Sequence, residues 1–181
     1  MKSDQVIGKK MVEKEELDQF LEAYEYVTGQ RLALVRSDEH PDFICARADE
    51  TLVGVELTRG EGDAKVMELI QEDQGEPDFG HYELDKVFLR IDEKERLRQG
   101  NLTLPSSSIL VVQMFFHPCA DIGSFSTPDL QQDFDQYGFT EIWLADYTTA
   151  EPYGGVELFG LKPAKWWGYH PREDFPGKPY G

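Results

Sequence analysis

Residues 41–58 read Pro-Asp-Phe-Ile-Cys-Ala-Arg-Ala-Asp-Glu-Thr-Leu-Val-Gly-Val-Glu-Leu-Thr, and the interpretation of the fold starts from this stretch. Two short apolar segments, 42–46 and 52–58, flank a polar stretch. Apolar runs of this length around a polar turn are typical of a β-hairpin. The hairpin predicts that Asp42 and Glu56, which are 14 positions apart (56 − 42), reach the same end of a sheet.

This pair of acids is the first candidate functional site. Two carboxylates at one point repel, and both stay ionised only if a cation lies between them. Hard oxygen ligands of this kind suit Mg²⁺ or Mn²⁺, and such a site could hydrolyse a phosphodiester. In the alternative interpretation, Asp42 only caps a strand entrance after Pro41 and Glu56 faces solvent. Glu56 shares its strand face with Leu52 and Gly54, which is not an obviously polar face.

Length and composition predict one domain spanning residues 1–181. Of the 181 residues 40% are hydrophobic, which argues against disorder. No apolar run approaches the roughly 20 residues of a membrane span. The first residues lack the apolar core of a signal peptide. We therefore expect a cytoplasmic protein that does not associate with membranes, with Cys45 and Cys119 as buried thiols.

The net charge of −17 is unusual for a protein that binds nucleic acid. Nucleic-acid affinity normally depends on clustered Lys and Arg side chains. An acidic protein with a pI near 4.5 equally suits a basic protein partner.

The periodicity of apolar residues predicts an α/β protein with helices packed on the faces of a sheet. Three consecutive strands with short turns should form an antiparallel meander, and the strand after the long helix should add in parallel. Expected helices cover 12–28, 64–72, 81–99 and 128–136, and expected strands cover 31–35, 42–46, 52–58, 108–116, 141–146 and 156–161. Residues 162–181 are rich in Pro, Gly and aromatics and predict an irregular tail.

This element order, together with Pro41-Asp42 and Glu56-Leu57-Thr58, resembles the PD-(D/E)XK nuclease-like (restriction-endonuclease-like) superfamily over residues 1–116. The resemblance implies an αβββαβ core with a mixed central sheet, to which residues 117–161 add a helix and further strands. It also implies a Mg²⁺ site for phosphodiester cleavage. Asp42 and Glu56 would hold the metal, and the backbone carbonyl of Leu57 would complete its shell.

The sequence departs from the family pattern at Thr58, where the motif has a catalytic lysine. Members of the superfamily can carry this lysine on the following helix, and Lys94 is the candidate here. Arg90 and Arg98 flank it and are the candidate nucleic-acid-binding residues. Alternatively, this basic segment only neutralises the carboxyl end of the helix.

The family often places a glutamate of the first helix near the metal. Glu13 is the first candidate for this catalytic role because it lies on the apolar stripe of Leu17, Phe20 and Tyr24, and Glu16 is the second. A charge on an apolar face needs a reason. The alternative is an acid favoured by the helix dipole.

Two functions remain open from the sequence. The first is a Mg²⁺-dependent nuclease acting on DNA or RNA. The second is a catalytically inactive acidic protein on the same fold, which binds a basic partner as an inhibitor or immunity protein would. A homodimer whose basic patch forms on assembly is a third option. Trp166 and Trp167 could stack on bases or fasten the tail to the sheet.

Overall fold

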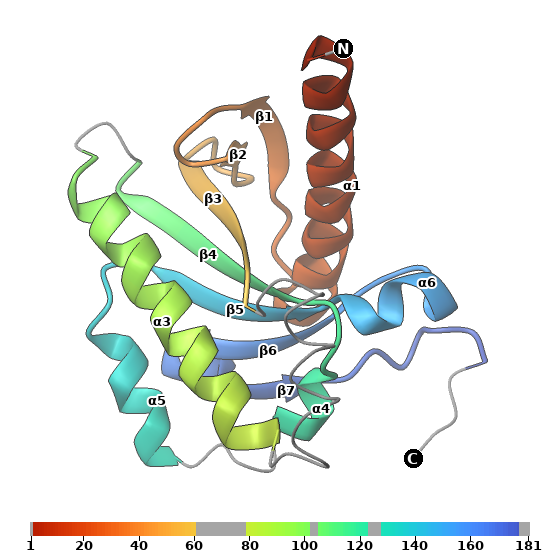
Figure 1. The fold of residues 1–181 in the computed structure, drawn as a ribbon, viewed down its shortest axis with the longest axis vertical. Helices are drawn as coiled ribbons and strands as arrows, with labels where there is room; N and C mark the ends of the chain where they lie inside the picture. The colour runs from red at the N-terminus through yellow and green to blue at the C-terminus, as the bar shows by residue number, and fades with distance from the viewer. Residues whose placement is uncertain (1, 61–78, 102–104, 123–127, 178–181) are drawn as a thin grey trace.

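The computed structural model of the 181-residue chain describes residues 2–60, 79–101, 105–122 and 128–177. The helix expected at 64–72 lies outside these residues. The described chain is a mixed α/β protein with one sheet (Figure 1). The helices are α1 (Lys2–Thr28), α3 (Phe79–Gln99), α4 (Cys119–Ile122), α5 (Pro128–Asp135) and α6 (Ala150–Tyr153), and the strands are β1 (Ala33–Ser37), β2 (Phe43–Ala46), β3 (Leu52–Arg59), β4 (Ser107–Met114), β5 (Glu141–Asp146), β6 (Glu157–Lys162) and β7 (Gly168–His170).

The seven strands lie in the sheet in the same order as in the sequence. β1, β2 and β3 form the antiparallel meander that the sequence predicts. β4 adds to β3 in parallel and β5 adds to β4 in parallel, whereas β6 and β7 return antiparallel. β4 is therefore the central strand, and all of its residues from 108 to 114 are buried, as its continuous apolar sequence predicts.

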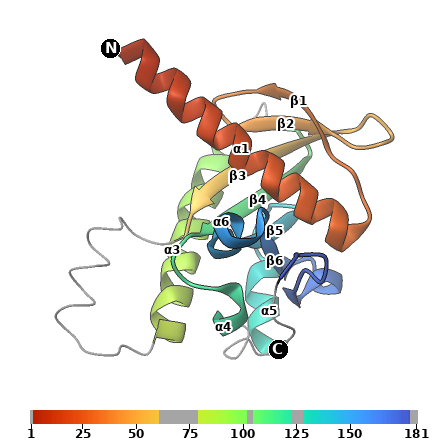
Figure 2. The same ribbon diagram turned by 90° about the vertical axis from the view of Figure 1, so that its right-hand side faces the viewer.

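Helices lie on both faces of the sheet (Figures 1 and 2). Two layers of buried apolar side chains hold them there. Alternate residues of a strand face opposite sides, so β4 contributes to both layers. Val111 packs in the layer with Leu17 and Phe20 of α1, and Leu110 packs in the layer with Val87 of α3. The sheet is thus covered by α1 on one face and by α3 and α5 on the other.

Helix α1 begins at Lys2, ten residues before its predicted start at residue 12. The first half of α1 extends past the sheet (Figure 2). Its apolar side chains, including Ile7 and Met11, are exposed, so they show none of the periodic burial on which the prediction relied. The predicted end at Thr28 is confirmed: Gly29 has φ 70° and its N–H donates to the Glu25 carbonyl at 2.8 Å.

The expectation of an irregular tail is wrong for residues 168–170, which form β7 at the edge of the sheet. Aromatic contacts hold this segment. Trp166 lies 6.2 Å from Trp143 between ring centroids, and Trp167 lies 5.6 Å from Phe159. Both tryptophans pack on the sheet, so the expectation that they could fasten the tail is confirmed.

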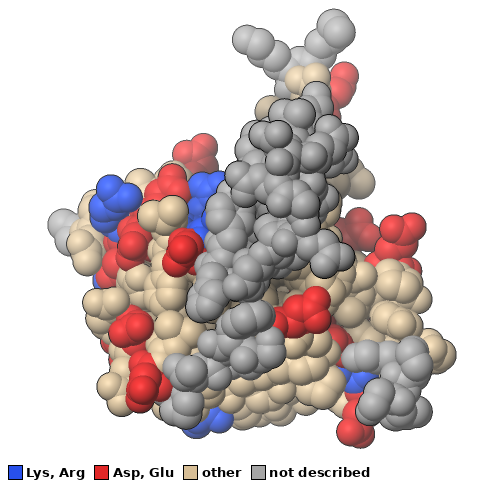
Figure 3. Space-filling model, turned by 60° about the horizontal axis from the view of Figure 1, so that its bottom comes forward, with Lys and Arg blue, Asp and Glu red and all other residues tan. Residues whose placement is uncertain are grey.

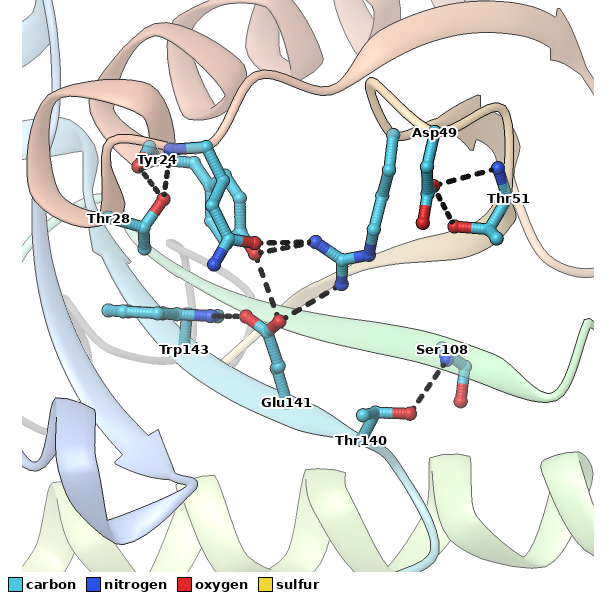
Figure 4. Close-up of polar contacts among 10 residues, drawn as sticks. Tyr24, Thr28, Asp49, Thr51, Ser108, Thr140, Glu141 and Trp143 are labelled. Atoms are coloured by element: carbon cyan, nitrogen blue, oxygen red, sulfur yellow. Dashed lines mark hydrogen bonds and ion pairs between the residues drawn. The ribbon is translucent and has the colours of Figure 1, made fainter.

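A buried polar cluster ties α1 to the sheet (Figure 4). The Glu141 carboxylate at the start of β5 accepts hydrogen bonds from the Tyr24 hydroxyl at 2.9 Å and from Trp143 Nε1 at 2.9 Å. Arg47, in the β2–β3 turn, lies 3.2 Å from the same carboxylate. Burial and the neighbouring Glu141 raise the pKa of Tyr24 to about 12, so its hydroxyl remains a donor.

Candidate functional site

The register of the β2–β3 hairpin brings Asp42 and Glu56 together. Phe43 pairs with Val55, so the residue before Phe43 lies opposite the residue after Val55. Opposite residues of an antiparallel pair point to the same face. The Asp42 N–H donates to Glu56 Oε2 at 3.3 Å, and the Leu57 N–H donates to Asp42 Oδ2 at 2.9 Å. The predicted convergence of the two acids is therefore present in the structure.

The environment of Asp42 disfavours its negative charge. Burial and the charge of Glu56 raise the pKa of Asp42 from 3.8 to about 6. Glu13 adds to this effect, while the Leu57 amide and Lys94 oppose it. A carboxyl group in a cleft whose pKa is raised by burial and by a specific neighbouring charge is a candidate functional group.

Lys94 of α3 forms an ion pair with Glu56. Its Nζ lies 2.6 Å from Glu56 Oε1, and the two side chains are only 20% and 12% exposed. Thr58 itself is buried. Helix α3 therefore carries an ammonium group that lies beside the acid pair, although Lys94 is 38 residues from Glu56 in the sequence.

A cleft of about 600 Å³ opens beside Asp42, between the projecting half of α1 and helix α3. Its walls include Asp42 and Thr58 from the hairpin, Lys94 and Arg90 from α3, Gln113 from β4, and Glu13 from α1. The α1 wall of the cleft combines Glu13 and Glu16, which lie in the predicted helix, with Gly8 and Lys9 of the N-terminal extension that the sequence did not predict.

The two acids of α1 occupy different surroundings. Glu13 is half-buried at the cleft wall and pairs with Lys9 at 3.5 Å. Glu16 accepts a hydrogen bond from Gln113 Nε2 at 2.9 Å and lies 3.7 Å from the Arg59 guanidinium. Both residues line the cleft with Asp42.

The structure separates the two candidate arginines of α3. Arg90 lines the cleft beside Asp42, where it donates to the Arg59 carbonyl at 3.0 Å and pairs with Glu93 at 2.8 Å. Arg98 lines a second cavity and forms two hydrogen bonds to Glu95. The two arginines therefore do not form a single basic patch.

Gln113 is a site residue that the sequence reasoning missed. It is 3% exposed and lies opposite Arg59 in the parallel β3–β4 pair. A signal was available, since Gln113 is the one amide side chain within the apolar run 108–116. A buried amide in a central strand needs partners, and here they lie at the cleft.

The donor set suits Mg²⁺ on chemical grounds. Within the described residues, no three His, Cys, Asp or Glu side chains form a metal-binding group. Mg²⁺ does not require one, because it retains several waters and is commonly held by one or two carboxylates together with substrate phosphates. Asp42 and Glu56 supply two such carboxylates, and the charge of Glu56 is one of the causes that raise the pKa of Asp42.

Taken together, the fold and the site describe a mixed α/β protein with an acid pair and a lysine at one end of its sheet. A scan against family models, a search of curated proteins and a search of solved structures each found no match to the chain. In the described part of the chain, no helix combines the length and apolarity needed to cross a membrane.

Proposed function

We propose that the protein is a Mg²⁺-dependent phosphodiester hydrolase with a PD-(D/E)XK-like site on a restriction-endonuclease-like fold. The observation that carries the proposal is the 2.6 Å contact between Lys94 and Glu56. It places an ammonium beside the acid pair even though the motif position, Thr58, has none. The meander, the crossover to a parallel strand and the acid pair on β2 and β3 support the same proposal.

Each side chain has a role in this proposal. Asp42 and Glu56 would hold the ion, and the ion would supply Lewis acidity and lower the pKa of an attacking water. Lys94 would orient that water and stabilise negative charge on the phosphate. Glu13 would assist from the cleft wall, and Gln113 would keep Glu16 oriented through its hydrogen bond. Arg90 lines the same cleft and could contact a neighbouring phosphate.

Activity is tested with labelled single- and double-stranded DNA and RNA in Mg²⁺ at low salt. We expect cleavage by the natural protein, and at least about 100-fold slower cleavage by Asp42→Asn and Lys94→Ala. Lys94→Arg should retain part of the activity because it keeps the positive charge. Lys14→Ala, at an exposed residue of α1 outside the cleft, is the matched control. Equal rates for Lys94→Ala and Lys14→Ala would refute the role of Lys94.

Mg²⁺ binding has a separate readout that does not require cleavage. An ion that binds only the folded state raises the melting temperature by mass action. We expect Mg²⁺ to raise the melting temperature of the natural protein and to have little effect on Asp42→Asn. An equal rise in both proteins would refute a metal site at Asp42.

The second candidate is an acidic protein that binds a basic partner. It is favoured by the net charge of −17 and by the internal pairing of Arg90 with Glu93 and of Arg98 with Glu95. The face seen in Figure 3 likewise carries more acidic than basic side chains. If the natural protein neither binds nor cleaves any of the oligonucleotides, this function replaces the hydrolase.

A further inference from the structure

A second cavity, of about 400 Å³, lies on the other side of the Glu56–Lys94 ion pair. Lys94 and Leu97 line both cavities, whereas Asp42 lines only the cleft beside α1 and Glu56 lines only the second cavity. The ion pair is thus the partition between the two spaces. A ligand group in the second cavity would be the immediate neighbour of a group bound at Asp42.

The walls of this cavity are mainly apolar, with hydrogen-bonding groups among them. Phe139 and Pro41 line the cavity, and Phe139 is buried. Ile109 also lines it, although its side chain packs in the apolar layer with α1. The backbone of Ser108 is fixed by Thr140, which accepts from the Ser108 N–H at 3.1 Å (Figure 4). Thr140 also donates its own N–H to the Ser108 carbonyl at 2.8 Å. A rigid pocket with apolar walls and a few polar groups suits a flat heteroaromatic ligand.

Two of the cations at this cavity, Lys94 and Arg98, are paired within the protein, whereas Arg96 lines it as an exposed residue. Glu95 accepts two hydrogen bonds from Arg98, at 2.9 and 2.8 Å, and Lys94 is paired with Glu56. The Arg98 guanidinium also lies 5.7 Å from the centroid of Phe139. Beside these charges, the cavity offers apolar contact and hydrogen bonds to a neutral ring.

We propose that the second cavity binds one unstacked nucleobase of a single-stranded nucleic acid whose phosphate lies at Asp42 and Glu56. The phosphate half of this statement rests on the proposed function. A volume of about 400 Å³ accommodates one nucleoside but not a stacked duplex. Base contacts would also supply affinity that an acidic protein cannot obtain from phosphates alone, because base stacking does not require cations. The substrate class is therefore single-stranded nucleic acid.

The first experiment measures nucleoside binding without metal, so that it is independent of cleavage. Adenosine and uridine are titrated into the ¹⁵N-labelled protein, with ribose as the probe that lacks a base. We expect both nucleosides to shift the amide resonances of Ser108, Ile109 and Phe139, and ribose to leave them unchanged. No shift at these amides, the same shift with ribose, or shifts confined to Thr58 and Gln113 in the other cleft would each overturn the proposal.

Two variants connect this binding to the cavity. Ser108→Leu adds volume at the wall and should weaken nucleoside binding at least about tenfold, whereas Ser108→Ala should leave it nearly unchanged. Gly100→Trp adds volume at the rim, where an added Cβ meets only ordinary contacts of 3.7 and 3.9 Å, and Gly100→Ala is its control. The amide spectrum of each variant reports whether it is folded. Unchanged affinity in both folded large variants would overturn the proposal.

The final comparison addresses the substrate. Single-stranded oligonucleotides of DNA and of RNA, and the corresponding duplexes, are offered with Mg²⁺. We expect single strands to be cut at least about tenfold faster than duplexes, and Ser108→Leu to reduce this ratio. Equal rates on single strand and duplex would overturn the substrate class. Nucleoside binding without any cleavage would refute the hydrolase but support the base site. Cleavage without nucleoside binding would support the hydrolase but refute the base site.

Discussion

The ammonium of Lys94 lies 2.6 Å from Oε1 of Glu56, and this contact joins the C-terminal half of α3 to the third strand of the sheet. Both side chains are largely buried, so removing either partner would leave the other charge without its ion-pair partner in a partly desolvated place. Asp42 is the third member of this group, because Glu56 raises its pKa and Lys94 lowers it. The charge state of Asp42 therefore reports on the other two residues.

Lys94→Gln and Glu56→Gln should move the pKa of Asp42 in opposite directions. Burial and Glu56 raise this pKa to about 6, and Lys94 opposes them. Loss of the lysine should therefore raise it further, whereas loss of the glutamate charge should lower it. A ¹³C titration of the Asp42 carboxyl measures both shifts, with Lys14→Gln as the control at an exposed lysine. Shifts in the same direction would contradict the coupling.

Asp42→Asn should stabilise the protein at high pH but not at low pH. The folded-state pKa of Asp42 is about 6, above its ordinary 3.8, so folding takes up a proton between these values. The ionisation of Asp42 therefore lowers the free energy of unfolding progressively as the pH rises from about 4 to about 6. Above pH 6 this loss of stability is complete. The amide keeps an oxygen that can accept from the Leu57 N–H.

We expect a gain of about 1–3 kcal/mol at pH 8, and little gain below pH 4. Urea denaturation at the two pH values measures the difference. Glu15→Gln, at an exposed residue of α1, controls for the change in net charge. An equal change in the free energy of unfolding at both pH values would show that the pKa of Asp42 is not raised in the folded state.

Glu141→Gln should lower the free energy of unfolding by about 3 kcal/mol, since it leaves Arg47 without its buried negative partner. Tyr24→Phe removes one donor to Glu141 and should cost about 1–2 kcal/mol. Because the two residues share a hydrogen bond, the double variant should cost less than the sum. Urea denaturation of all three measures this, and Lys14→Ala should stay within about 0.5 kcal/mol. A double variant whose loss of stability equals the sum of the two single losses would show that Tyr24 and Glu141 do not interact.

Gly160→Ala should destabilise the protein by more than about 2 kcal/mol. An added Cβ would lie 1.9 Å from the carbonyl oxygen of Trp166, so the backbone of the tail would have to move. Gly8→Ala is the matched change at a helical site with nothing within 4 Å, and should be neutral or stabilising by up to about 1 kcal/mol. Thermal melts followed by tryptophan fluorescence compare the two. Similar melting temperatures for Gly160→Ala and Gly8→Ala would contradict the close approach of Gly160 to the Trp166 carbonyl.

The sequence predicted the features that depend on short-range patterns. The alternation around Glu56, the polar turn at 47–51 and the apolar run that became β4 each follow from local periodicity, and each is present in the structure. The convergence of Asp42 and Glu56 followed because a hairpin of fixed length leaves few alternative registers.

Features that depend on tertiary contacts were not predictable in the same way. The first ten residues of α1 bury few apolar side chains, so no periodic signal marks them as helix. β7 forms because β6 offers an open edge, which its own three residues do not reveal. Arg90 and Arg98 line different cavities, and each forms an ion pair with a different glutamate of α3, which the sequence alone does not reveal.

The cluster around Glu141 has a consequence for how the chain acquires its structure during synthesis. Strand order in the sheet equals chain order, so each strand can add to the one made just before it. Helix α1 is synthesised before the strands, yet the hydrogen-bond partner of Tyr24, Glu141, lies 117 residues further along the chain. The apolar face of α1 therefore stays partly exposed to solvent until β5 has been synthesised. Arrested chains that end before and after Glu141 should differ sharply in how well α1 resists proteolysis.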